Sequence, residues 1–201
     1  MTTVANSTLL ANVAPVFVVL GGWLIFRTRV TKTYLLGLGA AMIGVFILSR
    51  SSLSLSDNHF FGDLVGLLAA FFYAAYQMSV ERLRKRFSTI TIMKFAIPIS
   101  ALCMIPIALA SGDELLPVTL AGWAFLVALA AGPQVLGQGL IAWALAHLPV
   151  AFASVSLLIQ PVTAGFVAWL LFDEVIGTQQ AIGGLIVLAG IMLARRGSSR
   201  R

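Results

Sequence analysis

The sequence predicts an all-α membrane protein, a multi-pass bundle of transmembrane helices built as an inverted repeat. Sixty per cent of the 201 residues are hydrophobic, ten per cent are charged, and the mean hydropathy is +1.00. The charges fall between apolar runs of roughly the 20 residues that a membrane span needs. In addition, two distant stretches of the chain match each other without a gap.

Seven apolar runs are the predicted spans. Helices are the only candidates, because hydrocarbon cannot satisfy the hydrogen bonds of free backbone groups. The second and seventh runs are short, so we expect them to extend into the flanking polar residues. Prolines inside several runs are tolerated as kinks. In chain order the predicted spans are Val4–Phe26, Thr33–Leu48, Phe61–Val80, Ile90–Ala110, Ala121–Ala146, Ala151–Phe172 and Ile176–Ala194.

An internal duplication joins the two ends of the chain. The stretch Ala5–Arg50 matches Ala151–Arg196, with each residue paired to the one 146 positions later. Proline, tryptophan and two glycines recur at matching positions, which indicates a duplication more strongly than the many leucines and alanines do. The matches include Pro15 with Pro161, Trp23 with Trp169, Gly37 with Gly183 and Gly44 with Gly190.

The distribution of charge predicts the orientation. Twelve of the thirteen basic residues lie on one side of a seven-span chain, and Arg50 alone lies on the other, with six of the seven acidic residues. The positive-inside rule makes the basic side cytoplasmic, which places the N-terminus outside and the C-terminus in the cytoplasm. The net charge of +6 is then a topology signal and not a sign of nucleic-acid binding. Because the first span and its copy cross in opposite directions, the repeat is inverted, as in many secondary transporters.

Several short motifs resemble the EamA domain, the repeat unit of the drug/metabolite transporter superfamily. They are PVTAGFVAWLLFDE at 161–174, QAIGG at 180–184 and LAG at 188–190, with GDL at 62–64 and ALAHLP at 144–149. Their order covers nearly the whole chain. The resemblance implies a ten-helix architecture of two inverted five-helix repeats that moves small metabolites.

The same resemblance implies a division of the chain. Residues 1–50 would be the last two helices of a truncated first repeat, and residues 61–196 a complete second repeat. An extracytoplasmic linker at 51–60 and a basic cytoplasmic tail at 197–201 complete the division. The first repeat would lack three helices, so we expect that this chain does not transport as a monomer.

Polar residues inside the spans are the candidate substrate pathway, because such groups are costly in lipid and tend to face the protein interior. The alternative is that they only join helices through hydrogen bonds worth about 0.6 kcal/mol each on average. Gly37, Ala41 and Gly44, like Gly183 and Gly190, are expected to form small-residue faces for close helix packing. The pathway candidates are Asn12, Pro15, Tyr73, Tyr76, Gln77, Gln134, Gln138, Ser156, Gln160 and Pro161.

The predicted function is transport of a small metabolite across the cell membrane, a bacterial inner membrane, by a secondary carrier that works by efflux or exchange. No catalytic residue, metal site or cofactor is predicted. His59 and His147 fall on opposite sides of the membrane, and neither HExxH nor a phosphate-binding glycine loop occurs. The alternatives are a non-transporting assembly partner and, less favoured, an intramembrane enzyme. The expected partners are the lipid bilayer, the metabolite, and a second copy or a complementing chain that supplies helices.

Reporter fusions test the topology. A reporter fused after Arg86 should report the cytoplasm, and one fused after Gly112 should report the opposite side, because one span separates these positions. Paired alkaline phosphatase and green fluorescent protein fusions measure this directly. The same side for both fusions would contradict the orientation and the inversion of the repeat.

Overall fold

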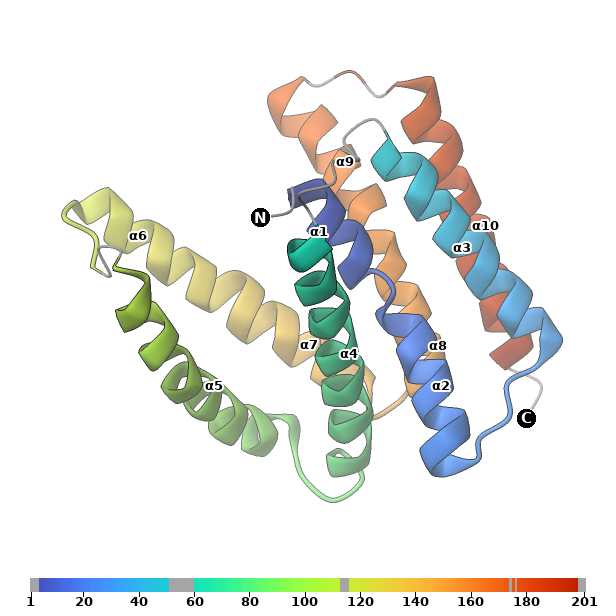
Figure 1. Ribbon diagram of the computed structural model, residues 1–201, viewed down its shortest axis with the longest axis horizontal. Coiled ribbons are helices and arrows are strands. Elements are labelled where there is room, and N and C mark those ends of the chain that lie inside the picture. Colours follow the sequence, from blue (N-terminus) through green and yellow to red (C-terminus); the bar gives the residue numbers. More distant parts are fainter. Residues whose placement is uncertain (1–3, 51–59, 113–115, 174, 176, 199–201) are drawn as a thin grey trace. The chain divides into compact units, whose positions relative to one another are not determined.

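The computed structural model describes residues 4–50, 60–112, 116–173, 175 and 177–198 (Figure 1). Seven helical stretches in these ranges are long and apolar enough to cross a membrane, which confirms the predicted multi-pass helical class. Glu174, residues 51–59 of the predicted linker and residues 199–201 of the predicted tail lie outside the described residues. The observed spans are Thr8–Phe26, Lys32–Ser49, Gly62–Leu83, Thr89–Ser111, Leu120–Ala144, Val150–Leu171 and Thr178–Ser198.

The chain divides into two compact units. The first contains Met1–Met78 and Leu148–Arg201, and the second contains Ser79–His147, so that α4 (Phe60–Leu83) runs from one into the other. The first unit holds α1 (Val4–Ala11), α2 (Ala14–Phe26), α3 (Lys32–Ser49), α8 (Val150–Ser156), η4 (Leu157–Ile159), α9 (Gln160–Phe172) and α10 (Thr178–Ser198). The second holds α5 (Thr89–Ser111), α6 (Leu120–Leu129), η3 (Ala130–Gly137) and α7 (Gln138–Ala144).

The two copies of the repeat share their helix boundaries. The helices α1, α2 and α3 begin 146 positions before α8, α9 and α10, and α2 ends 146 positions before α9. Both α2 and α9 are followed by a residue in the left-handed region, Arg27 with φ 50° and Asp173 with φ 52°. Because residues other than glycine rarely adopt a positive φ, this shared feature supports the duplication independently of sequence identity.

The last span differs from its predicted limits, Ile176–Ala194, at both ends. It begins at Thr178, because the backbone N–H of Gly177 donates a hydrogen bond of 3.0 Å to Oε1 of Gln180 and so fixes the start of the helix. It continues past Ala194 to Ser198, where Arg195 and Arg196 lie in the last turn. Cations are favourable there because they face the negative end of the helix dipole.

The copies α3 and α10 lie side by side and antiparallel, with their backbones in contact (Figure 1). A Cβ atom on Gly37 would overlap the backbone nitrogen of Ala194, and one on Gly190 would overlap the backbone nitrogen of Ala41. We call this contact the glycine seam. It confirms that the predicted small-residue faces serve close packing, and it shows that they face each other within one chain.

The glycine seam has a local two-fold symmetry. Adding or subtracting 146 positions turns the contact of Gly37 with Gly190 into that of Gly183 with Gly44, and both contacts are present. A Cβ atom on Gly44 would lie 2.8 Å from the carbonyl oxygen of Gly183, and one on Gly37 would lie 2.7 Å from that of Gly190. Equivalent helices therefore run in opposite directions, as an inverted repeat requires.

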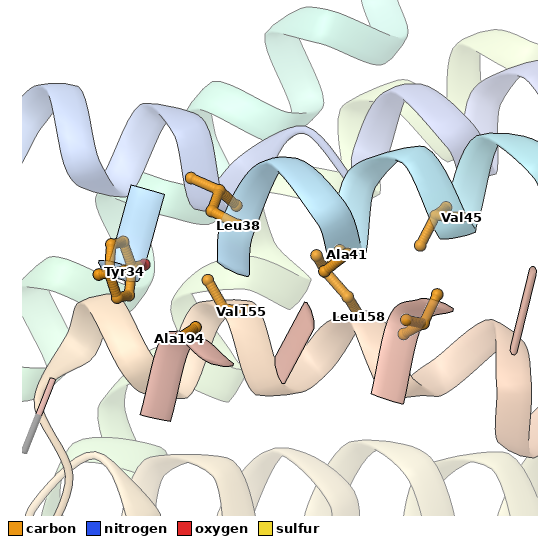
Figure 2. Close-up of a cluster of buried hydrophobic side chains, with 8 residues drawn as sticks. Tyr34, Leu38, Ala41, Val45, Val155, Leu158 and Ala194 are labelled. Atoms are coloured by element: carbon orange, nitrogen blue, oxygen red, sulfur yellow. The ribbon is translucent and has the colours of Figure 1, made fainter. Parts of the chain in front are cut away.

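One group of buried side chains covers the seam (Figure 2). It consists of Tyr34, Leu38, Ala41, Val45, Val155, Leu158, Val187 and Ala194. At its end the Tyr34 hydroxyl donates a hydrogen bond of 2.7 Å to the carbonyl oxygen of Ala151, which also accepts one of 2.9 Å from Ser154 Oγ. The Thr31 hydroxyl donates to the carbonyl oxygen of Gly197 at 2.9 Å and ties α3 to the end of α10.

A leucine at Gly190 tests the seam. We expect Gly190→Leu to lower the free energy of unfolding by at least about 1–3 kcal/mol, because its Cβ atom would overlap the backbone of α3. The thermal midpoint in detergent measures the loss. Gly39→Leu is the matched control, since no atom lies within 4 Å of a Cβ placed on Gly39. Equal stability of the two variants would show that the close contact between α3 and α10 does not stabilise the protein.

Candidate substrate pathway

The first span contains an irregular turn in its first half. Its two helices, α1 and α2, are separated at Asn12 and Val13, and Pro15 lies in the first turn of α2. Proline suits that turn, because its missing N–H would have no partner there. The Asn12 side chain stays local, with Nδ2 donating a hydrogen bond of 3.0 Å to the carbonyl oxygen of Thr8.

The copy of this span contains a tight turn at the matching place. The helix α8 ends at Ser156, the tight turn η4 follows, and α9 begins at Gln160 with Pro161 in its first turn. Ser156 Oγ donates to the carbonyl oxygen of Phe152 at 2.9 Å, a bond within its own helix. Gln160 keeps an exposed side chain. The two irregular turns are thus equivalent elements of the repeat.

The α4 candidates differ sharply in their surroundings. The rings of Tyr73 and Tyr76 are stacked, with centroids 6.3 Å apart and planes inclined by 13°. Gln77 is 1% exposed, and its Oε1 has no hydrogen-bond partner among the described residues. A buried amide oxygen without a partner is rare in proteins. Gln77 is therefore the strongest candidate of the first unit.

In the second unit, the candidates lie on a widened helical turn. The π-helical segment η3 contains Pro133, whose missing N–H removes a hydrogen bond of the regular helix. Gln134 in this segment is exposed, while Oε1 of Gln138 is buried and has no partner among the described residues. Widened turns of this kind are frequent at functional sites.

A cavity of about 410 Å³ lies in the second unit, between α5 and the segment from η3 to α7. Val135 and Gly139 form one wall, and Lys94 is the charged residue among the described residues of its lining. Thr89 also lines it and has a buried Oγ1 without a partner in the described chain. The surface of the cavity is almost entirely apolar, because Thr89 Oγ1 is buried and the side chain of Lys94 is exposed to the surroundings.

The structure groups the ten predicted residues by unit. Gln134 and Gln138 belong to the second unit, and the other eight belong to the first. Pro161 lines a cavity of about 540 Å³ in the first unit. The hypothesis that Gln134, Gln138 and Gln160 face one cavity stays a prediction, because they are divided between the units.

The sequence prediction missed two features of the pathway. The irregular turns at Asn12–Val13 and at 157–159 were expected only as proline kinks, although the matched Pro15 and Pro161 were a signal for them. Lys94 was counted as a basic residue that sets topology, and its place in a cavity needed the fold of α5 against α7. The place of Lys94 is not encoded in a local motif.

Comparison with known proteins identifies relatives along the whole chain. An uncharacterized transporter of Archaeoglobus fulgidus is 27% identical over 97% of this chain and 68% of its own length. The pseudopaline exporter CntI of Pseudomonas aeruginosa is 29% identical over 95% of this chain and 66% of its own length. A probable terminal-alkyne amino-acid exporter of Streptantibioticus cattleyicolor is 27% identical over 95% and 64%. The chain thus spans about two thirds of the length of these relatives.

The fold and the family model give the same assignment as these relatives. A protein of known crystal structure superposes with a TM-score of 0.80 at 19% identity, over 97% of this chain and 69% of that one. The model of the EamA-like transporter family matches residues 60–196. Members of this family are transporters, and seven apolar helices make this chain a multi-pass membrane protein. The chain belongs to the EamA-like transporter family.

Proposed function

We propose that this chain exports a small metabolite through a pathway formed at the two spans that carry matching irregular turns. The observation that carries the proposal is the pair of proline-associated irregular turns at matching positions of an inverted repeat, before Pro15 and before Pro161. In inverted-repeat transporters, irregular helices at matching positions of the two repeats are typical of substrate sites. In this chain the helical hydrogen bonds tighten at these points but continue, as from Val13 N–H to the carbonyl oxygen of Leu10 at 3.0 Å.

The proposed substrate is a small molecule that carries a carboxylate, such as an amino acid. Lys94, whose side chain is exposed, is among the residues that line the second-unit cavity and supplies a positive charge there. A cation suits a carboxylate, whose oxygens accept hydrogen bonds. Two relatives named as exporters, one of them for an amino acid, support the direction and the class.

We further propose the orientation and the setting of the pathway. The C-terminus lies in the cytoplasm and the protein in the cell membrane, since the basic residues lie on the C-terminal side of a seven-span chain. Residues 1–50 and 61–196 act as parts of two repeats. The exposed amides of Gln134 and Gln160 lie within spans and need polar partners, which favours assembly with a second copy or a complementing chain.

The Gln77→Leu variant tests whether Gln77 acts in transport or only in packing. Gln77→Leu should raise the free energy of unfolding by about 1–3 kcal/mol, because it removes a buried amide oxygen that lacks a partner. It should also reduce efflux of the substrate. Gln179→Leu is the control. Nε2 of Gln179 donates a hydrogen bond to the carbonyl oxygen of Ile47 at 3.1 Å. Loss of this hydrogen bond should lower the stability of the protein without affecting efflux. A less stable Gln77→Leu variant with normal efflux would assign Gln77 to packing.

Methionine at Lys94 tests the proposed substrate class. Lys94→Met should raise the half-saturating concentration of a carboxylate substrate by about 10–100-fold, which is the effect of losing one charge-assisted hydrogen bond. Efflux of a panel of radiolabelled amino acids and uncharged metabolites from proteoliposomes measures this. Lys85→Met is the control, since Lys85 is exposed outside the spans. Equal effects of both variants, or no transport of any carboxylate, would contradict the assignment.

A further inference from the structure

The cavity of about 540 Å³ in the first unit lies between α1, α3, α9 and α10. Its volume is within the range of about 300–1,000 Å³ that is typical of ligand pockets. Apolar side chains of α9 and α10 form most of its walls. They include Pro161, Val162, Phe166, Leu185 and Leu188.

Three residues that line the cavity are smaller than their counterparts in the first copy, although Leu185 is larger than its counterpart Gly39. Gly165, Ala181 and Gly184 line the cavity, whereas the matching residues of the first copy are larger. Those residues are Val19, Leu35 and Leu38. In the first copy Leu38 is 6% exposed within the packed side-chain group, and Tyr34, which matches Gln180 of the cavity, is 1% exposed. Leu38 thus fills in the first copy the space that its counterpart Gly184 leaves in the second, whereas Leu35, the counterpart of Ala181, is 46% exposed.

The polar residues of the cavity gather at one end. Ser49 is the last residue of α3, Gln180 lies in the first turn of α10, and Thr8 lies in α1 at the start of the first span. This end is the membrane boundary of the spans, and Leu185 and Leu188 lie farther along α10 in the apolar part. The cavity therefore has an apolar interior and a polar mouth at the depth where hydrocarbon gives way to headgroups.

We propose that this cavity binds the acyl chain of a membrane phospholipid, with the ester end of the chain at Ser49 and Gln180. The described residues of the lining include no charged side chain, which suits an uncharged hydrocarbon. An ionised amino acid would lose its hydration there without gaining a charged partner. The surrounding bilayer supplies acyl chains, and water is a poor occupant of apolar walls.

Filling the cavity with the residues of the first copy tests the proposal. The double variant Gly165→Val with Gly184→Leu reproduces Val19 and Leu38. Both positions have room for a first added carbon, since nothing lies within 4 Å at Gly165 and Val162 lies at 3.5 Å at Gly184. Gly39→Val is the control on α3, where a Cβ also meets no atom within 4 Å. Native mass spectrometry counts the phospholipids that each purified protein retains.

The unmodified protein and Gly39→Val should retain one more phospholipid than the filled variant. Equal counts in all three would overturn the proposal. A filled variant that loses transport but keeps its phospholipid would assign the cavity to the transported solute and would also overturn it. Because lipid retention is measured without substrate, this outcome is independent of the proposed transport function.

Fluorescence gives a second test that does not depend on the filled variant. The ring of Phe166 lines the cavity, and its centroid lies 5.6 Å from that of Trp169. With Trp169 as the sole tryptophan, a brominated-chain phospholipid added to delipidated protein in detergent should quench emission saturably. Quenching that rises in proportion to lipid without saturation would indicate only general contact with lipid and would contradict a bound chain.

Discussion

The glycine seam between α3 and α10 is the contact on which the first unit depends. In a bilayer, helices gain little from hiding apolar surface, so close backbone approach and dispersion must hold them together. Gly37 and Gly190 permit that approach, and the symmetric pair Gly183 and Gly44 repeats it. The seam also fixes the relation between the two copies, because it joins equivalent helices running in opposite directions.

The irregular turns before Pro15 and Pro161 follow from the same duplication and lie in the spans that we propose form the pathway. The backbone hydrogen bonds tighten before Pro15 and Pro161: the N–H of Val13 donates to the carbonyl oxygen of Leu10 at 3.0 Å, and the N–H of Gln160 donates to that of Leu157. The second unit reaches a similar result by another route, the widened turn around Pro133. Three spans therefore depart locally from regular α-helical geometry, two through tightened turns and one through a widened turn.

Much of the fold could be predicted from the sequence because hydropathy and small-residue spacing are local signals. The seven spans, the duplication and the packing role of Gly37 and Gly44 were recovered in this way. The site could be predicted less well. Gln77 and Gln160 look alike in sequence, yet one is 1% exposed and the other is exposed, since burial depends on which helices pack against each. A cavity is likewise a property of several helices together.

The two ends of the seam also differ in a way that symmetry alone does not explain. At one end Tyr34 fills the interior and bonds to the carbonyl of Ala151, while at the other its counterpart Gln180 borders a cavity. An empty cavity would forfeit the dispersion contacts that Leu38 makes at the filled end. A lipid chain in the cavity would restore those contacts without a covalent side chain. The bilayer would then complete the packing of the second copy, and the two ends of an unequal repeat would become comparably stable.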